Sequence, residues 1–262
     1  TKFFKPWKLI YYEAFYNKVG SIIGWDFSKI SRRKKTVGKE YNHLEIIKKY
    51  VNKKTKILDI GTGGGEKLLK IAPYANEAYG IDKSVSMIKT ARNNLKKSGL
   101  KNVKLILADS NNIPFNDEYF DVVFCIHAPF EVKEVKRVLK NNGIFITLQV
   151  GYKDKNNIQE VFGRGQGFEA KLDELMKRYL GELKNNKFRI IKKGKLNTVE
   201  YYANMEDIIF LLSNTPIIPD FNVKKDNKYL DILAKKYSSK KGIKTNASRF
   251  LIISKKILRN RL

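Results

Sequence analysis

Cysteine and histidine are scarce in this sequence of 262 residues, which holds one cysteine, Cys125, and two histidines, His43 and His127. One cysteine cannot form an internal disulfide, and so few sulfur and imidazole ligands exclude a cysteine-rich or histidine-rich metal centre, so we expect no bound metal. No apolar run approaches the roughly 18–20 residues that a membrane-spanning helix needs. No signal peptide is recognisable either. We therefore expect a cytoplasmic protein.

Acidic residues are also few: 26 against 53 basic ones, which gives a formal net charge of +27. Such a charge attracts polyanions, so RNA or DNA is one interpretation of it. The other is a codon bias toward lysine, because nucleic-acid surfaces often use arginine, whose planar fork binds phosphate in two places. Basic runs occur near residues 29–39, 184–195 and 235–244. None carries a recognisable RNA-binding motif, so the charge leaves the partner open.

Strand-like and helix-like patterns alternate between residues 55 and 150. Ser84 is a favourable helix N-cap, and Gly99 follows the expected end of that helix. Strands separated by helices form βαβ units with right-handed crossovers, so the pattern predicts an α/β fold with a parallel sheet. The patterns predict strands at Lys56–Ile60, Ala78–Ile81, Val103–Ala108, Phe120–Ile126 and Ile144–Val150, and helices at Glu66–Ile71, Ser84–Lys97 and Val132–Leu139.

The flanking segments follow other patterns. Near the N-terminus, Tyr12, Phe15 and Tyr16 share one helix face, which is typical of a stripe packed on the core or of a flap over a ligand. We divide the chain into an N-terminal helical, aromatic cap segment (1–50), a core (51–150), a substrate-cap insertion with the sixth-strand region (151–240) and a C-terminal strand that completes the sheet (241–262). Outside the core we expect helices at Lys39–Val51, near 172–180, at Met205–Leu212 and at 228–237, and strands at Phe188–Ile191, Thr198–Tyr202 and Arg249–Ile257.

The most informative segment is a buried strand that ends in a glycine-rich turn, from Asp59 to Gly65. Glycines allow a ligand to approach the backbone closely. A dinucleotide-binding turn has the pattern G-x-G-x-x-G. Here the sixth position is Glu66, whose negative charge is unfavourable beside a pyrophosphate. The turn therefore favours a ligand that carries no phosphate.

Two further acids follow the next predicted strands. Asp82 ends the second strand, where a carboxylate can accept hydrogen bonds from both hydroxyls of a ribose. Asp109 and Ser110 follow the third strand and could bind the edge of an adenine. Because the carboxyl ends of adjacent parallel strands meet at one edge of a sheet, these groups and Asp59 are expected around one nucleoside. The alternative is that each aspartate only forms a turn.

Together these motifs resemble the class I S-adenosylmethionine-dependent methyltransferases, and more closely the ubiquinone/menaquinone C-methyltransferase-like group with a type 11 methyltransferase domain. The resemblance covers roughly residues 50–150. One departure is Asn141-Asn142, where the family often has Pro-Gly before its fifth strand. The matching motifs are Asp59-Ile60-Gly61-Thr62-Gly63-Gly64, Asp82, Ala108-Asp109-Ser110, Pro114-Phe115, Phe120-Asp121-Val122-Val123, Glu134, Arg137-Val138-Leu139-Lys140 and Gly143.

The resemblance implies a Rossmann-like, doubly wound, mostly parallel seven-stranded sheet and a methyltransferase that uses S-adenosyl-L-methionine. The residues it places at the cofactor are Asp59, Gly61, Thr62, Gly63, Asp82, Lys83, Met87, Asp109, Ser110 and Ile126.

His127 follows the fourth strand, the position that faces the transferring methyl in this fold. Its near-neutral pKa makes it a candidate catalytic base, and the alternative is that it only shapes the pocket. Amino-methylating members carry Asn/Asp-Pro-Pro-aromatic here, and Ala128-Pro129-Phe130 supplies only part of that. We expect a small-molecule acceptor, with an rRNA or tRNA methyltransferase, or a non-catalytic cofactor-binding protein, as the alternatives.

Overall fold

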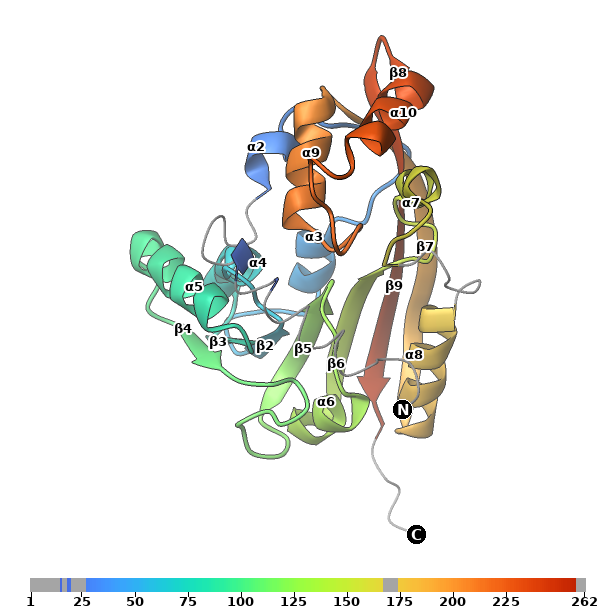
Figure 1. Ribbon diagram of the computed structural model, residues 1–262. Coiled ribbons are helices and arrows are strands. Elements are labelled where there is room, and N and C mark those ends of the chain that lie inside the picture. Colours follow the sequence, from blue (N-terminus) through green and yellow to red (C-terminus); the bar gives the residue numbers. More distant parts are fainter. Residues whose placement is uncertain (1–14, 16–17, 20–26, 167–173, 258–262) are drawn as a thin grey trace.

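The computed structural model describes residues 15, 18–19, 27–166 and 174–257 (Figure 1). The predicted stripe residues Tyr12 and Tyr16 lie outside these residues, as do 23 of the 50 residues of the N-terminal cap segment and the start of the helix expected near 172–180. In the described part of the chain, no helix is long and apolar enough to cross a membrane.

A single mixed sheet organises the described residues, and its strands lie in the order β1-β7-β9-β6-β5-β2-β3-β4. The pairs joining β4, β3, β2, β5 and β6 are parallel, whereas β9 is antiparallel to both β6 and β7. Of the seven longer strands, only β9 therefore runs against the others. The strands are β1 (Lys35–Val37), β2 (Lys56–Ile60), β3 (Glu77–Asp82), β4 (Val103–Leu107), β5 (Phe120–Ile126), β6 (Leu139–Val150), β7 (Phe188–Tyr202), β8 (Ser238–Ser239) and β9 (Gly242–Lys256).

This arrangement confirms the predicted α/β, Rossmann-like fold and adds two short strands to the seven expected. β1 pairs antiparallel with β7, and β8 pairs antiparallel with β9. With three and two residues, they are too short to leave an alternating pattern in the sequence.

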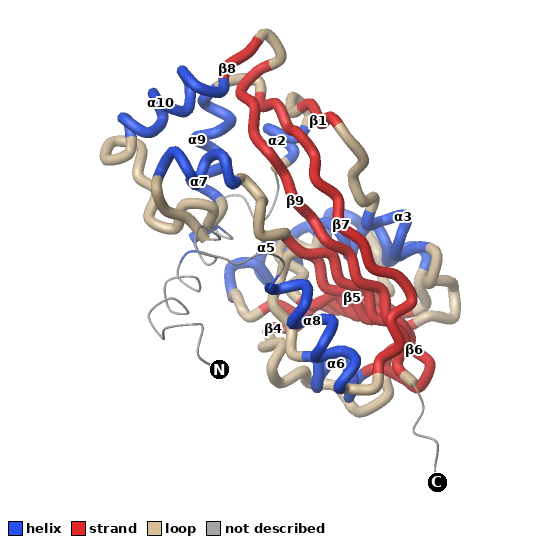
Figure 2. The backbone as a smooth tube through the Cα atoms, turned by 90° about the vertical axis from the view of Figure 1, so that its right-hand side faces the viewer, coloured by secondary structure: helices blue, strands red, loops and turns tan. Residues whose placement is uncertain are grey.

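Helices cover both faces of the sheet (Figure 2). One face packs against α3 (His43–Lys48), α4 (Glu66–Ile71) and α5 (Val85–Ser98), through side chains such as Ile47, Leu68 and Ala91. The other packs against α6 (Val132–Val138) and α8 (Glu174–Asn185). A short 3-10 helix, η1 (Ala72–Tyr74), follows α4. Because both faces are covered, the central strands are buried, which explains why they are nearly continuous apolar runs.

Two predicted helix boundaries illustrate the effect of capping. Ser84 caps α5 by accepting a hydrogen bond from the Met87 amide at 3.3 Å, and Gly99 ends that helix in the left-handed conformation, as predicted. The helix predicted at Lys39–Val51 is shorter. Asn42 accepts a hydrogen bond from the Glu45 amide and starts α3 at His43.

Beyond the end of β6, the strands β7 and β9 continue as a two-stranded ribbon. The ribbon packs against α2 (Ser28–Ser31), α7 (Asn156–Phe162), α9 (Met205–Asn214) and α10 (Asn227–Tyr237), which share an apolar core separate from those on the two faces of the main sheet. We call these four helices and the ribbon the helical end; it lies at the top of Figure 1. Helices at Met205–Leu212 and 228–237 were predicted, but α7 was not.

The strand predictions in this region were wrong in extent. The two short strands expected at Phe188–Ile191 and Thr198–Tyr202 are one continuous strand, β7. The last strand begins at Gly242 instead of Arg249. The intervening residues of β7 include three lysines, so no apolar pattern marks them, and their pairing with β9 holds them in the sheet.

Candidate functional site

The glycine-rich turn between β2 and α4 adopts a backbone that only glycine tolerates well. Gly61, Gly63 and Gly65 have φ values of 72°, 57° and 80°, in the left-handed region. A Cβ atom at Gly61 would lie 2.2 Å from the Cβ of Ala128, which follows β5. The predicted cofactor loop and the predicted acceptor segment are therefore in direct contact.

Asp82 organises this turn from the end of β3. Its Oδ2 accepts a hydrogen bond from the Gly63 amide at 2.9 Å, and its Oδ1 accepts one from the Ser84 amide at 2.9 Å. Burial raises the pKa of Asp82, although these two amide bonds favour the carboxylate. Each carboxylate oxygen keeps a lone pair for a further donor. The side chain can thus hold the loop and accept from a ligand at the same time.

Asp59 lies beneath the turn and not on its surface. It is 2% exposed and accepts a hydrogen bond from the Thr62 hydroxyl at 2.9 Å. Burial raises its pKa to about 7, while the nearby Lys67 ammonium opposes that rise. Among the predicted site residues, Asp59 and Thr62 therefore stabilise the shape of the loop from inside.

The remaining predicted cofactor residues lie along the same edge of the sheet. The backbone of β4 joins that of β3 there, since the Ala108 amide donates to the Asp82 carbonyl at 3.0 Å. Asp109 is exposed and its Oδ1 accepts from the Asn111 amide at 2.8 Å, while Ser110 is half-buried. Met87 is buried at 2% exposure on α5, and Lys83 is exposed.

His127 stands at the end of β5 in an unusual conformation. Its φ is 60°, which is uncommon for a residue with a side chain, and its amide donates to the Leu148 carbonyl at 2.9 Å. Its Nε2 is buried, and within the described chain it has no hydrogen-bond partner. Burial, followed by the positive charges of Arg249 and Lys67, holds the pKa of His127 well below its ordinary value. Ile126, just before it, is buried.

Two side chains that the sequence did not single out support this segment. Gln149, on β6, donates from Nε2 to the Ala128 carbonyl at 2.9 Å and to the Thr147 hydroxyl at 2.9 Å. Cys125 donates its thiol to the same carbonyl, with 3.1 Å between Sγ and O. Gln149 lies within the strand predicted at Ile144–Val150, but only the three-dimensional pairing of β5 with β6 shows what it contacts.

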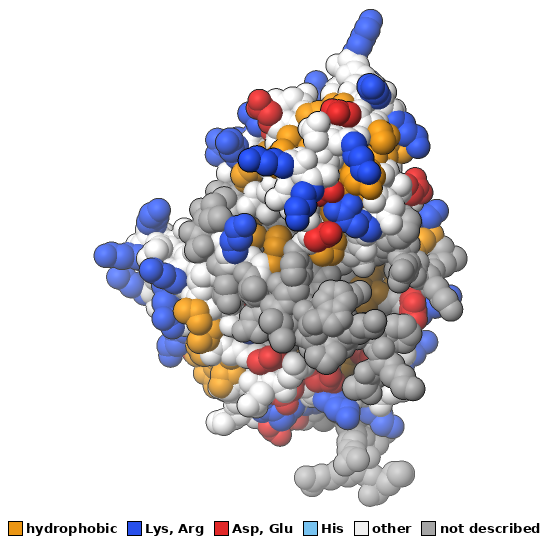
Figure 3. All heavy atoms as spheres, in the orientation of Figure 1, with side chains coloured by type: hydrophobic (Ala, Val, Ile, Leu, Met, Phe, Trp, Pro, Cys, Tyr) orange, Lys and Arg blue, Asp and Glu red, His pale blue; other side chains and the backbone are white. Residues whose placement is uncertain are grey.

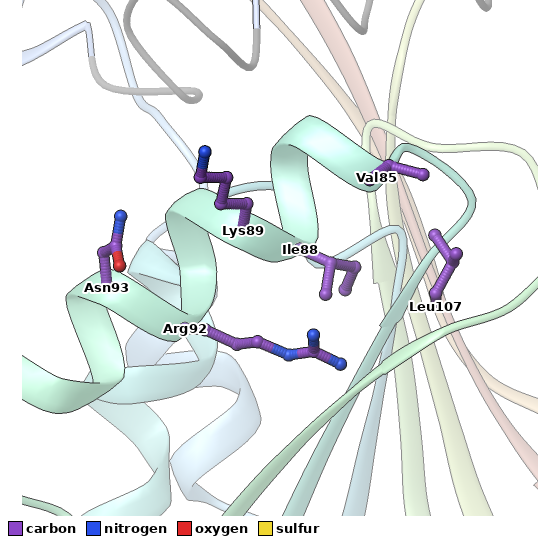
Figure 4. A pocket seen from close by; sticks show the side chains of 6 residues that line it. All are labelled: Val85, Ile88, Lys89, Arg92, Asn93 and Leu107. Carbon is purple, nitrogen blue, oxygen red and sulfur yellow. The ribbon is translucent and has the colours of Figure 1, made fainter.

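A separate shallow pocket of about 370 Å³ lies on the outer side of α5, against the edge strand β4 (Figure 4). Val85 and Leu107 face each other across it, and Arg92 reaches toward β4, where it donates to the Leu105 carbonyl at 3.3 Å. None of the predicted site residues lines this pocket. The predicted site is instead the row of loop, carboxylate and imidazole at the carboxyl ends of β2, β3 and β5.

The fold and the glycine turn define a Rossmann-like nucleoside-binding protein of the methyltransferase type. A family model described as a methyltransferase domain matches residues 51–229, more than half of the chain. The chain therefore belongs to this family, the S-adenosylmethionine-dependent methyltransferases. The predicted resemblance and the predicted cofactor, S-adenosyl-L-methionine, are confirmed.

Curated relatives match with moderate identity. The uncharacterized methyltransferase YcgJ of Bacillus subtilis is 34% identical over 98 residues, which cover 35% of this chain and 39% of that protein. The uncharacterized protein MJ1252 of Methanocaldococcus jannaschii is 28% identical over 223 residues, 81% of this chain and 80% of that protein. A demethylmenaquinone methyltransferase of Staphylococcus aureus is 31% identical over 144 residues, 51% of this chain and 55% of that protein. The first and third matches thus span less than two thirds of their relatives.

Solved structures share the fold at lower identity. A putative methyltransferase of Bacillus halodurans superposes with a TM-score of 0.61 at 20% identity, covering 82% of this chain and 98% of that one. The structure of YcgJ gives a TM-score of 0.60 at 22% identity, with 84% and 100% covered. At these identities the two structures show the fold alone.

Proposed function

We propose that this protein transfers a methyl group from S-adenosyl-L-methionine to a small-molecule acceptor. The observation that carries the proposal is the contact between the Gly61 loop and Ala128, which brings the Asp82-bound turn beside His127. A nucleoside held by the turn would then lie next to the only imidazole at the ends of the described parallel strands.

The residues at the turn fit this cofactor. Gly61 and Gly63 leave the backbone open to close approach, and Asp82 presents a carboxylate to a ribose. Glu66 begins α4 beside them, where it would repel a pyrophosphate but not an uncharged ribose or a positively charged sulfonium. We propose Asp82, Gly61 and Gly63 as the main cofactor contacts, with Asp109, Ser110, Lys83 and Met87 on the adenine side.

When bound, S-adenosylmethionine supplies a methyl group already activated by a positive sulfur. The chain then has to align the acceptor and exclude water. His127 is suited to accept a proton from an acceptor hydroxyl or acidic carbon, because its lowered pKa keeps the imidazole neutral near neutral pH, with one ring nitrogen free to accept. We therefore propose His127 as the base, positioned by Gln149 through the backbone of Ala128.

We also propose that the helical end, together with residues 1–50, covers the acceptor. Its apolar core of Ile158, Phe162, Leu212 and neighbouring side chains is separate from the two cores of the main sheet. On the face drawn in Figure 3, lysine and arginine side chains are spread over the helical end and α5, with apolar and acidic side chains between them. This scattered pattern supports a small acceptor over an RNA, and a cytoplasmic location is part of the proposal.

The acceptor class can be tested directly with labelled S-adenosylmethionine and fractionated cell extract. We expect label in the small-metabolite fraction and a large loss of turnover in His127→Asn, whose side chain is uncharged and cannot act as a base. Label in RNA would favour the alternative suggested by the net charge of +27. Binding of the cofactor without transfer to any fraction would instead indicate a cofactor-binding protein without catalysis.

A further inference from the structure

Lys67 is a partly buried cation that the proposed function does not use. It lies in the first turn of α4, directly after the glycine-rich turn, and is intermediate in exposure. It makes no hydrogen bond or salt bridge to any part of the chain that the structure describes. Most buried or half-buried lysines are paired, so an unpaired ammonium at this position needs an explanation.

The surroundings of Lys67 are the groups of the proposed active site. Its charge acts on Asp59 beneath the turn, on Cys125 at the end of β5, and on both His43 and His127. Lys70, one turn further along α4 and exposed, acts on His43 alone among these groups. From its place one residue into α4, Lys67 therefore acts electrostatically on groups at the carboxyl ends of both β2 and β5, whereas Lys70 acts on His43 alone among them.

Arg249 brings a second positive charge to the same edge. In β9 it pairs with Val150, the last residue of β6, while the His127 amide binds the Leu148 carbonyl two residues earlier. Its Nη1 donates to Asp154 and to the Ser248 carbonyl, and no other nitrogen of Arg249 is bound within the described residues. One edge of its guanidinium thus remains available for a further acceptor.

Two positive charges act on His127, those of Arg249 on β9 and Lys67 on α4. Arg249 is paired with one carboxylate, that of Asp154. His43, at the start of α3, lies near these groups but is uncharged at neutral pH, because its pKa is lowered to about 4. His127 Nε2 is buried without a partner in the midst of these groups. The ammonium of Lys67 and the N–H groups of Arg249 beyond Nη1 are the donors that a carboxylate or phosphate group requires.

We infer that Lys67 and Arg249, beside His127, form a subsite for a carboxylate or phosphate group of the methyl acceptor. This inference rests on the proposed function, and it names the acceptor class as an anionic small molecule. Because the Gly61–Ala128 contact brings the turn held by Asp82 beside the segment of His127, an acceptor held at this subsite by its anion would have its nucleophile close to both. The net charge of +27 would speed the encounter with such an acceptor.

The test uses the full chain saturated with S-adenosylhomocysteine, which carries no transferable methyl. Benzoate, acetate and inorganic phosphate are titrated as probes, and their binding is measured by calorimetry. The NMR signals of the two histidines are recorded in the same titrations, and the His43→Gln variant assigns which signal belongs to which histidine. We expect at least one probe to bind and to raise the pKa of His127, by about one unit, because an adjacent anion favours the imidazolium. Lys67→Met should weaken the binding of that probe by roughly tenfold. Lys67→Arg should restore it, and Lys70→Met, the matched control, should leave it unchanged.

Three results would overturn the inference. If S-adenosylhomocysteine binds but no probe binds, the subsite is wrong while the proposed function stands. Lys67→Met could instead weaken the binding of S-adenosylhomocysteine and leave the binding of the probes unchanged. If the binding of methylthioadenosine, which lacks the amino-acid part, is unchanged as well, the anion that Lys67 binds is the cofactor's own carboxylate. If Lys67→Met and Lys70→Met weaken the binding of the probes equally, the effect comes from the net charge of the protein and not from a specific site. Failure of S-adenosylhomocysteine itself to bind would remove the proposed function together with the subsite.

Discussion

The Gly63 amide donates a hydrogen bond to Asp82 Oδ2 at 2.9 Å, and this bond joins the turn after β2 to the end of β3. The proposed ribose-binding carboxylate is thus also the group that fixes the cofactor loop. Loop geometry and ligand binding depend on the same side chain.

Asp82→Asn should therefore weaken S-adenosylhomocysteine binding by roughly 10- to 100-fold, since a hydrogen bond to a charged group contributes about 1.5–3 kcal/mol. Isothermal titration calorimetry measures this directly. Asp231→Asn, at an exposed position on α10, is the matched control and should bind like the wild type. Equal affinity in both variants would show that Asp82 does not contact the cofactor.

Gly61→Ala tests the close approach of the two site segments. The added Cβ would meet the Ala128 Cβ at 2.2 Å, and φ would stay at 72°, so we expect a loss of about 2–4 kcal/mol in the free energy of unfolding. Gly99→Ala has a similar φ of 69° with no atom within 4 Å of the new Cβ, and should lose only about 1–2 kcal/mol.

Chemical denaturation of both glycine variants separates the cost of the backbone conformation from that of the steric clash. Adding Ala128→Gly to Gly61→Ala should recover the clash contribution only. If Gly61→Ala were no worse than Gly99→Ala, the contact between the turn and the acceptor segment would not be tight.

Glu200→Gln tests a buried ion pair in the helical end. Glu200 accepts from Lys155, with both residues at 3% exposure or less, and Lys34 also binds it. Burial alone would raise the pKa of Glu200, but the two ammonium groups outweigh it and hold the pKa at about 2.

Removal of the carboxylate leaves Lys155 charged and buried, so the free energy of unfolding should fall by about 3–5 kcal/mol. Glu206→Gln, exposed in the first turn of α9, should change it by less than about 1 kcal/mol. Because the folded pKa is lowered, the difference between wild type and Glu200→Gln should persist above about pH 4.5 and shrink as the pH falls toward 2. A constant difference across this range would contradict the assignment.

His43 makes stability depend on pH at less acidic values than Glu200 does, between about pH 6.5 and 4. Burial and then the charges of Lys67 and Lys70 lower its pKa from 6.5 to about 4. Between these values the unfolded chain binds a proton that the folded chain does not, so the free energy of unfolding falls as the pH drops.

His43→Gln lacks this contribution. Urea unfolding at pH 7 and pH 4.5 should show that the wild type loses about 1–2 kcal/mol more than the variant, a range reduced for partial solvent screening. Comparing the two proteins cancels the contribution of Asp59, whose raised pKa acts in the other direction. Equal losses would mean that His43 titrates normally in the folded state.

The central strands could be predicted because burial on both faces requires continuous apolar residues. β2 and β5 were predicted with their observed bounds, and α5 was predicted to within a residue through its two caps. The ribbon of β7 and β9 could not be predicted in full, because its exposed residues are lysines and other polar residues. Their strand conformation is set by pairing between distant segments.

Spacing along one strand–turn unit is enough to predict the proposed cofactor residues Gly61, Gly63 and Asp82. Lys67 could not be proposed from sequence, since a lysine in an amphipathic helix has no distinguishing pattern. Its proposed role depends on the folded chain, in which its charge acts on both histidines. The support of His127 by Gln149 likewise depends on strand pairing.

The ribbon of β7 and β9 has a mechanical consequence. The same two strands pass without interruption from the main sheet, where β9 pairs with β6, into the helical end, where they carry α9 and α10. A rigid-body rotation of the helical end would have to bend or break this hydrogen-bonded ladder. With the acceptor under the helical end, as we propose, we expect its entry and the departure of the methylated product to depend on small local displacements of helices and loops, because the two strands join the two ends of the molecule.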